Sequence, residues 1–338
     1  MTADTLPLTG LARPLLRVSP SALDAWRDCP RRYRHQYVDR PPPARYGPSA
    51  HFSLGVSVHS VLRDWHLLPP DRRTVGAASS LLDLAWVKDG YRDDAQESEW
   101  RARARSWVTS YVAGVDPATE PYAVERKVVG LYGDNQFFGR LDRLDDRSGE
   151  LVVVDYKTGR SGVSAEEARG SWALAIYAYA AERTLRRPVR RVELHHVPTG
   201  DVVAHEHTVE SLRRHLDRMS ETAEEVRAAK AAVEAGADPD EAYPTAASPG
   251  CAWCDFHRSC PAGRAVVPRA REPWDGLASD GDRTVPPAPP APPAPPASAP
   301  PASSAPPAPA PPAPPAPAAP DDGPLVLLDA PGPAPPPT

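Results

Sequence analysis

The stretch FFGRLDRLDDRSGELVVVDYK (137–157) decides the fold that we expect for this chain. It reads as two successive β-strands, 137–145 and 150–157, with turn residues at 147–149 between them. The segment YAVERKVVGLY (122–132) reads as a third strand directly before them. Three consecutive strands predict that a β-sheet forms the centre of the protein.

Helical periodicity on both sides of these strands predicts an α/β fold, in which helices flank a mixed sheet. Ser19 and Pro20 are typical of a helix start, with serine as the cap and proline at the first helical position. Residues 191–198 and 202–208 predict a further hairpin. The other expected helices span residues 55–68, 77–114 (one or two helices), 165–186 and 209–235.

Composition divides the chain into three parts. Residues 1–17 lack a clear pattern and are expected to be a flexible N-terminus, and residues 18–265 form one domain. Residues 266–338 are expected to be a disordered tail, because 25 of the 45 prolines follow position 285 and most other residues there are alanine. Such a segment buries too little apolar area to offset its ordering entropy.

Charge and hydrophobicity exclude several classes of protein. The formal net charge is −5, and residues 286–338 carry three aspartates and no cation, so the rest of the chain is close to neutral and any basic surface must be local. We find no secretory signal and no apolar run of membrane-spanning length, which favours the cytoplasm. None of the four lysines follows a glycine, so the chain has no phosphate-binding motor loop.

Asp142, Asp155 and Lys157 have the chemistry of a phosphodiester-cutting site. Antiparallel pairing of their two strands would bring both carboxylates to one sheet edge, where Mg²⁺ could bind them. Asp155 and Lys157 are two residues apart and therefore point to the same face, whereas Tyr156 points away. The chain has 35 arginines and four lysines, so a lysine at position 157 indicates that a compact cation is needed.

The four cysteines predict a second site. Cys29 stands alone, and CAWCDFHRSC contains Cys251, Cys254 and Cys260 more than two hundred residues later. Disulfides are rare in the cytoplasm, so this grouping indicates a thiolate metal site that joins the two ends of the domain. Four thiolates can hold either Zn²⁺ or a [4Fe–4S] cluster, and the spacing does not choose between them.

Taken in order, these motifs resemble the RecB-type branch of the PD-(D/E)XK nuclease superfamily, which includes Cas4-like proteins and the AddB-type nuclease domain. The resemblance covers about Ser19 to Pro261. The matching motifs are S-x-S-x-L with Cys-Pro (19–30), G-x-x-x-H (55–59), G-x-x-D-R-x-D (139–145), D-Y-K-T-G (155–159) and the cysteine triplet. It implies a restriction-endonuclease-like core whose N- and C-terminal helical parts are joined by a metal cluster.

The resemblance also implies roles for residues. His59, Asp142, Asp155 and the carbonyl of Tyr156 would hold Mg²⁺ or Mn²⁺, and Lys157 would be catalytic. The family's lone cysteine and C-terminal triplet imply a [4Fe–4S] cluster on Cys29, Cys251, Cys254 and Cys260, with zinc as the alternative. Glu125 is either an auxiliary acid or a surface strand residue.

The resemblance has one departure. The family often carries Gln-x-x-x-Tyr after the lysine, and here Tyr177 is present but Ala173 replaces the glutamine. A contact to DNA or to the active site is therefore in doubt. Tyr177 remains a candidate DNA contact, together with Arg31, Arg32 and Arg34, whose alternative role is an ordinary solvated face.

The expected function is a metal-dependent DNA exonuclease that acts on single strands or DNA ends in repair or recombination. Because the chain has no motor loop, a helicase or another repair protein would supply any unwinding. The alternatives are nuclease action on RNA and a non-catalytic iron–sulfur module that binds nucleic acid or senses redox state.

Overall fold

The computed structural model describes residues 14–40 and 48–277, and all statements below concern these residues. The strands are β1 (Leu16–Val18), β2 (Pro121–Tyr132), β3 (Asn135–Arg147), β4 (Glu150–Lys157), β5 (Val189–His196) and β6 (Asp201–Glu206). The longer helices are α1 (Pro20–Asp28), α3 (Ala50–Leu67), α4 (Val75–Ala85), α5 (Asp94–Ala113), α7 (Trp172–Leu185) and α8 (Val209–Glu234). The short helices are α2 (Pro30–Tyr33), α6 (Ala165–Gly170), α9 (Pro239–Ala242) and α10 (Pro261–Val266), with π or 3-10 turns at Arg34–Asp39, Pro70–Arg72, Pro249–Trp253 and His257–Ser259.

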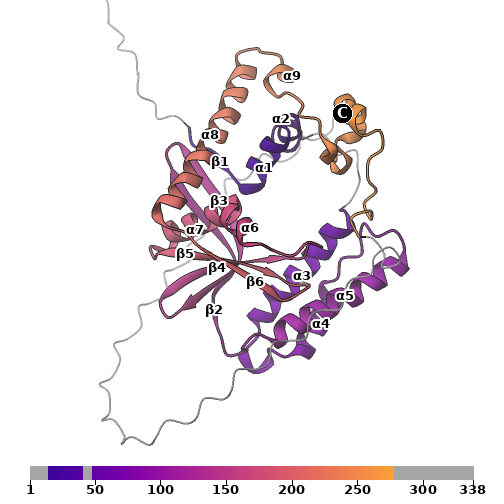
Figure 1. Cartoon of the computed structure of the whole chain (residues 1–338), viewed down its shortest axis with the longest axis vertical. Helices are drawn as coiled ribbons and strands as arrows, with labels where there is room; N and C mark the ends of the chain where they lie inside the picture. The colour runs from indigo at the N-terminus through magenta and orange to yellow at the C-terminus, as the bar shows by residue number, and fades with distance from the viewer. Residues whose placement is uncertain (1–13, 41–47, 278–338) are drawn as a thin grey trace, which may run out of the picture. The chain divides into compact units, whose positions relative to one another are not determined.

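The six strands form one mixed sheet (Figure 1). Its order is β1-β3-β4-β5-β6, and β2 pairs with β3 off this path. β3 runs antiparallel to β2 and β4, whereas β4 and β5 are parallel. The parallel step requires a crossover, which α6 and α7 provide, and the hairpin of β5 and β6 then completes the sheet. The mixed sheet predicted from the sequence is therefore confirmed.

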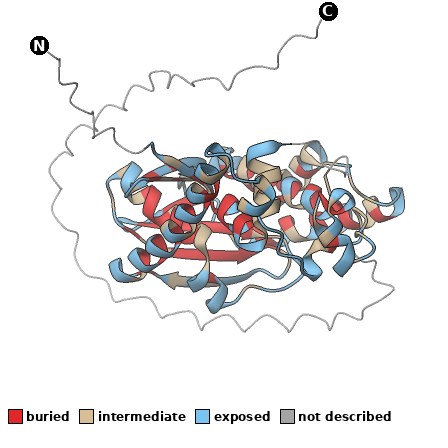
Figure 2. Ribbon diagram, turned by 90° about the horizontal axis from the view of Figure 1, so that it is seen from above, coloured by how far each residue is buried: buried red, intermediate tan, exposed pale blue. Residues whose placement is uncertain are grey.

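Helices cover both faces of the sheet. α7 and α8 lie on one face, while α3, α4 and α5 lie on the other (Figure 1). Each face has its own apolar core, and Figure 2 shows the buried residues gathered in the sheet and on the helix sides turned toward it. A smaller cluster around Trp26 and Tyr243 joins α1, α8 and α9. The result is the α/β arrangement expected from the sequence.

The alternation of side chains in β4 fixes which residue faces which layer. Leu151 and Val153 belong to the core under α7 and α8, whereas Val152, Val154 and Tyr156 belong to the core under α3–α5. Because successive side chains of a strand point to opposite faces, Asp155 and Lys157 continue the first set. The burial pattern of one strand thus orients the residues that the sequence singled out.

Local sequence signals explain most of the helix starts. The hydroxyl of Ser19 accepts from the N–H of Ala22 at the start of α1, and that of Thr208 accepts from the N–H of Ser211 at the start of α8. These caps satisfy donors that a helix leaves free in its first turn. The helix expected at 165–186 is wrong in one respect, since it is divided into α6 and α7. Ser171 leaves helical geometry and caps the N–H of Leu174, which starts a new helix.

Contacts in the structure extend beyond both domain boundaries expected from composition. Residues 1–17 were expected to be flexible throughout, but Leu16 and Arg17 belong to β1, which pairs with β3. The tail was expected from residue 266, but Leu277 is only 2% exposed and its carbonyl accepts a bond of 2.7 Å from the Gln96 side chain. The backbone N–H of Ala50 also donates to the Pro273 carbonyl. The Pro/Ala-rich part of the tail lies outside the described residues.

None of the described helices is both long and apolar enough to cross a membrane.

Gly130 in β2 gives a direct test of how α7 packs on the sheet. A methyl group there would lie 2.7 Å from Cε1 of Tyr179 and 3.2 Å from the Cα of Ala180. The Tyr179 ring cannot move freely, because its hydroxyl donates to the Leu131 carbonyl. We predict that Gly130→Ala lowers the free energy of unfolding by about 1–3 kcal/mol, the usual cost of overpacking.

Urea unfolding followed by circular dichroism measures this effect. Gly162→Ala is the matched control, because a methyl group there meets no atom within 4 Å, and it should not destabilise the protein. Equal unfolding midpoints for both variants would contradict the packing described for α7.

Candidate active site

The β3–β4 hairpin brings the two motif aspartates together. The turn is tight, with Ser148 and Gly149 both at positive φ (55° and 92°), and it pairs Arg147 with Glu150. This register places Asp142 beside the end of β4, where its Oδ2 accepts the backbone N–H of Tyr156 at 2.8 Å. The antiparallel arrangement expected from the sequence is thus present, and one carboxylate of β3 is fixed against the backbone of β4.

Asp155 and Lys157 lie on the same face of β4, as the strand period requires. The Lys157 Nζ is 2.7 Å from the Asp155 Oδ2, and Asp155 is buried. Tyr156 points the other way, into the core under α3–α5, and its hydroxyl accepts from the Arg143 guanidinium at 2.8 Å. Arg143 is itself held by Asp145 at 2.8 Å. A buried hydrogen-bond network therefore holds Tyr156, which lies between Asp155 and Lys157 in β4.

His59 reaches the site from α3. Its Nδ1 is 3.1 Å from the Asp142 Oδ1, so the two oxygens of Asp142 contact one side chain and one backbone group. The ring of His59 also meets the Tyr156 ring edge-on, with centroids 5.8 Å apart. The four residues named from the sequence therefore form two contacting pairs, His59 with Asp142 and Asp155 with Lys157, and Asp142 also bonds the backbone of the intervening Tyr156.

Glu125 joins this group. Ligand atoms of His59, Glu125 and Asp142 all lie within 4.8 Å of one another. Glu125 lies in β2 at the position across from Asp142, because the neighbouring pairs are Val124 with Arg143 and Arg126 with Leu141. Of the two roles that the sequence left open for Glu125, this geometry favours the auxiliary acid.

The backbone at Glu125 is unusual. Its φ is 51°, in the left-handed region, which costs a residue other than glycine about 1–2 kcal/mol. Such outliers persist where the surrounding structure holds them, and they are frequent at functional sites. A sequence pattern carries no signal for this conformation, so strand periodicity alone could not place the carboxylate.

Burial and the neighbouring carboxylates shift the pKa values of the groups in this site. Burial raises the pKa of Asp155, and Asp142 adds to this despite Lys157. Burial lowers the pKa of His59 and of Lys157, but the neighbouring carboxylates outweigh it, so both pKa values are raised. Burial and then Asp155 raise the pKa of Tyr177 as well. The three carboxylates of Glu125, Asp142 and Asp155 outnumber the two cations beside them, Lys157 and Arg140, which lies 3.5 Å from Glu125, so the site can accept an additional cation.

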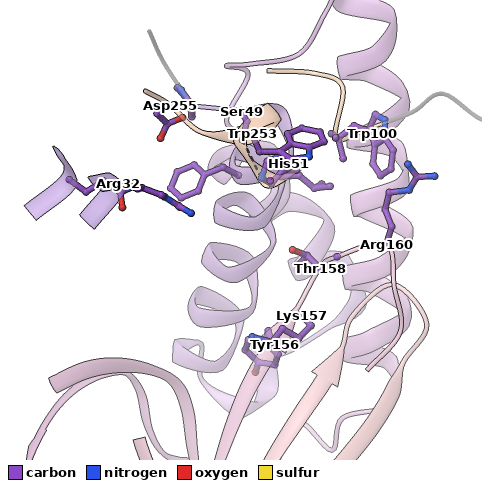
Figure 3. A pocket seen from close by; sticks show the side chains of 18 residues that line it. Arg32, Ser49, His51, Trp100, Tyr156, Lys157, Thr158, Arg160, Trp253 and Asp255 are labelled. Carbon is purple, nitrogen blue, oxygen red and sulfur yellow. Dashed lines mark hydrogen bonds between the residues drawn. The ribbon is translucent and has the colours of Figure 1, made fainter. Parts of the chain in front are cut away.

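Lys157 lines two cavities. One has a volume of about 1010 Å³ and extends from Lys157 past the N-terminal end of α3 to the cysteine segment (Figure 3). The other, of about 670 Å³, lies toward α1 and α7 and contains Asp155, Ala173 and Tyr177. A substrate can therefore approach the lysine from two sides.

Tyr177 and Gly139 pack against each other in the wall of the second cavity. A methyl group at position 139 would lie 2.4 Å from Cε1 of Tyr177, so the tyrosine ring rests directly on the glycine of the G-x-x-D-R-x-D motif. Ala173, where the glutamine is missing, lines the same cavity. The departure from the motif therefore falls beside Asp155 and Lys157.

The three arginines that were candidates for DNA contacts all form ion pairs within the protein. Arg31 pairs with Asp240 at 3.0 Å, and Arg34 pairs with Asp39 at 2.7 Å and with Asp240 at 2.9 Å. These two arginines hold α2 and the following turn against α9. Of the three, only Arg32 lines the larger cavity, and it also pairs with Asp28.

The four cysteines line a separate cavity of about 190 Å³. All four are free thiols, and no three of their sulfur atoms lie within 4.8 Å of one another. Backbone N–H groups of Ala246, Ser248 and Gly263 each lie 3.4 Å from a cysteine sulfur. Burial raises the pKa of Cys254. The cavity therefore brings four sulfur atoms and three backbone N–H donors to one place in the described part of the chain.

Comparison with known proteins agrees with this geometry. The sequence profile of the PD-(D/E)XK nuclease superfamily matches residues 17–261, which include every site residue named above. Among solved structures, the chain is similar to a presumed exonuclease from Eubacterium rectale, with 11% identity over 60% of this chain and 76% of that one. The TM-score of 0.40 is too low to support an argument about function.

A search among curated proteins gives no match. The match to the superfamily profile covers well over half of the chain and includes the strands, the hairpin and the acidic site just described. The chain therefore belongs to the PD-(D/E)XK nuclease superfamily.

Proposed function

We propose that this protein is a Mg²⁺- or Mn²⁺-dependent deoxyribonuclease that removes nucleotides from single-stranded DNA or DNA ends during repair or recombination. The observation that carries the proposal is the presence of the pairs His59–Asp142 and Asp155–Lys157 at the β3–β4 hairpin, with Lys157 lining two open cavities. Membership of the superfamily supports DNA as the substrate. The exonuclease mode, the RecB-type relationship and a cytoplasmic role are parts of the proposal.

The residues fit a divalent cation. Carboxylates and one histidine converge, and their surplus negative charge raises the pKa of neighbouring groups. His59, Asp142 and Glu125 converge and would hold the ion, and the resemblance adds Asp155 and the Tyr156 carbonyl as further ligands. When bound, the ion supplies charge stabilisation at the phosphate and activates water.

Each residue has a task that follows from its surroundings. Lys157 remains a charged donor, because Asp155 and Asp142 outweigh its burial, and it can orient water and stabilise negative charge at the phosphate. Asp155 positions the lysine by their ion pair of 2.7 Å. Asp142 fixes His59 and the Tyr156 backbone at once, which keeps the three elements β3, β4 and α3 in register.

We propose a [4Fe–4S] cluster on Cys29, Cys251, Cys254 and Cys260, with a structural role. The choice of a cluster over zinc rests on the resemblance, in which a lone N-terminal cysteine and a C-terminal triplet hold such a cluster, and the four cysteines line one cavity of about 190 Å³. Such a group would connect α1–α2 with the segment before α10, so its binding free energy would add to folding stability.

We also propose that the nuclease domain extends to Leu277, because residues 271–277 bond to α3, α5 and the cysteine segment. A helicase or another repair protein acting in trans would supply unwound strands.

A cleavage assay tests the proposed function. The substrates are end-labelled single-stranded DNA, double-stranded DNA and RNA of the same sequence, each incubated with Mn²⁺, Mg²⁺ or EDTA. Metal-dependent shortening of DNA supports it, and a lack of cleavage in every arm contradicts it.

Lys157 gives the first prediction. Lys157→Ala should lower the cleavage rate by about 100-fold or more, since the donor at the phosphate is lost. Lys157→Arg should also be severely impaired, because the planar fork cannot occupy the space of a compact ammonium group. Lys230→Ala, on the exposed side of α8, is the control and should cleave normally. Full activity of Lys157→Ala would show that the site is wrongly assigned.

Glu125 gives the second prediction. Glu125→Gln keeps the size of the side chain but removes its charge from the group with His59 and Asp142. We expect half-maximal cleavage to require about 10- to 100-fold more Mn²⁺, as for the loss of a residue that supports a metal site. Glu150→Gln, at the exposed start of β4, should leave the requirement unchanged. If Glu125→Gln needs the same Mn²⁺ concentration as wild type, Glu125 is a surface strand residue and not a part of the metal site.

The cysteines give the third prediction. Protein purified without oxygen should be brown and contain about four irons per chain. Replacing any of the four cysteines by serine should lower iron content and melting temperature together, because both ends of the domain depend on the site. Elemental analysis and thermal unfolding measure these effects. A colourless protein with one stoichiometric zinc would contradict the iron–sulfur assignment.

A further inference from the structure

Two large aromatic side chains are exposed inside the same cavity as Lys157. Phe52 is 60% exposed and Trp253 is 42% exposed, and both line the 1010 Å³ cavity. Among the described residues, Tyr122 is the other aromatic in the exposed class, and it does not line this cavity. Single exposed apolar residues are ordinary, but two aromatics that share one hollow point to a ligand.

Trp253 is held in place rather than left loose. It ends the 3-10 turn Pro249–Trp253, between Cys251 and Cys254. The ring of His51 meets it edge-on at 6.2 Å, and the Arg271 guanidinium lies 5.8 Å from its centroid. Figure 3 shows Trp253 and His51 adjacent at the end of α3. The indole is therefore a positioned surface that depends on the cysteine segment.

The floor of the cavity is the end of β4. Tyr156, Lys157 and Thr158 line it, and Arg160 follows them (Figure 3). Arg32 contributes a third cation and Asp255 a single acid. The cavity thus has aromatic faces at one side, cations along its wall and the proposed catalytic lysine at its floor. A single nucleic-acid strand has the matching groups, because its bases can stack on aromatic rings and its phosphates can pair with cations.

We propose that Phe52 and Trp253 form a base-stacking subsite that binds unpaired nucleotides next to the phosphodiester that is cut. This inference rests on the proposed nuclease function and assigns its strand preference to two residues. Bases in a duplex already stack on one another, so their faces are not available to these rings. Unpaired bases of any sequence can stack, so the subsite selects for strandedness without selecting for sequence.

The test is a binding measurement in EDTA, in which cleavage does not occur. The probes are fluorescent DNA strands of about 20 nucleotides, longer than the ~4–16 nucleotides of common single-strand sites. One probe is oligothymidine, one is an abasic strand with the same phosphates, and one is a blunt duplex. The full chain is used as wild type, Phe52→Ala, Trp253→Ala and Trp253→Phe.

The proposal predicts that wild type binds oligothymidine more tightly than the abasic strand or the duplex. Phe52→Ala and Trp253→Ala should each weaken oligothymidine binding about tenfold or more, the usual effect of one lost stacking partner. Binding of the abasic strand should stay the same. Trp253→Phe keeps an aromatic face beside the cysteines and should restore most of the affinity.

Tyr122→Ala is the matched control, because Tyr122 is 42% exposed, like Trp253, but lies outside the cavity. It should bind every probe like wild type. Because Phe52 is remote in sequence from the cysteines, its variant separates stacking from damage to the metal site. Iron content and thermal unfolding of both variants check this directly.

The outcomes distinguish this inference from the nuclease proposal. Base-dependent binding that Phe52→Ala weakens supports the subsite even in a protein that shows no cleavage. Equal affinity for oligothymidine and the abasic strand, or unchanged affinity in both alanine variants, overturns it, even if wild type cleaves DNA. Equal losses on all three probes also overturn it, because they would indicate a general change in the surface.

Discussion

The pairing of β3 with β4 is the constraint on which the rest of the structure depends. One hydrogen bond joins the two strands at the site, because the Asp142 carboxylate in β3 accepts the backbone N–H of Tyr156 in β4. With the register fixed, strand alternation sends Tyr156 into one core and leaves Asp155 and Lys157 on the opposite face. A slip of one residue would bury the lysine and expose the tyrosine, so core packing and site geometry enforce each other.

The second constraint is that distant segments meet around this hairpin. α3 brings His59 to Asp142 from one layer, and β2 brings Glu125 from the neighbouring strand. At the far end of the larger cavity, the cysteine segment places Trp253 above the end of β4. The four cysteines line a cavity of their own, but the segment that carries three of them also lines the cavity of Lys157, so a structural metal group on the cysteines could influence substrate binding without taking part in the chemistry.

The sequence predicted those features that depend on short-range rules. The three strands, the hairpin turn, the shared face of Asp155 and Lys157, and the capped helix after Ser19 follow from period, turn residues and caps. The sequence could not predict β1, because three residues that pair with a distant strand carry no pattern of their own. Nor could it place Glu125 or the Phe52–Trp253 cavity, since these depend on a left-handed backbone position and on contacts across two hundred residues. Arg31 and Arg34, which were candidates for either DNA contacts or a solvated face, pair with Asp39 and Asp240, and no local pattern reveals these partners.

The most direct test of the central claim is a titration of Mn²⁺ into the protein without DNA, followed by electron paramagnetic resonance. Asp142→Asn is the matched variant, because it keeps the shape of the side chain that holds His59 and Tyr156. The account predicts that wild type binds Mn²⁺ at this site and that Asp142→Asn loses this binding while retaining its fold and iron. Identical Mn²⁺ binding in the two proteins would contradict the assignment of His59, Asp142 and Asp155 as a metal site.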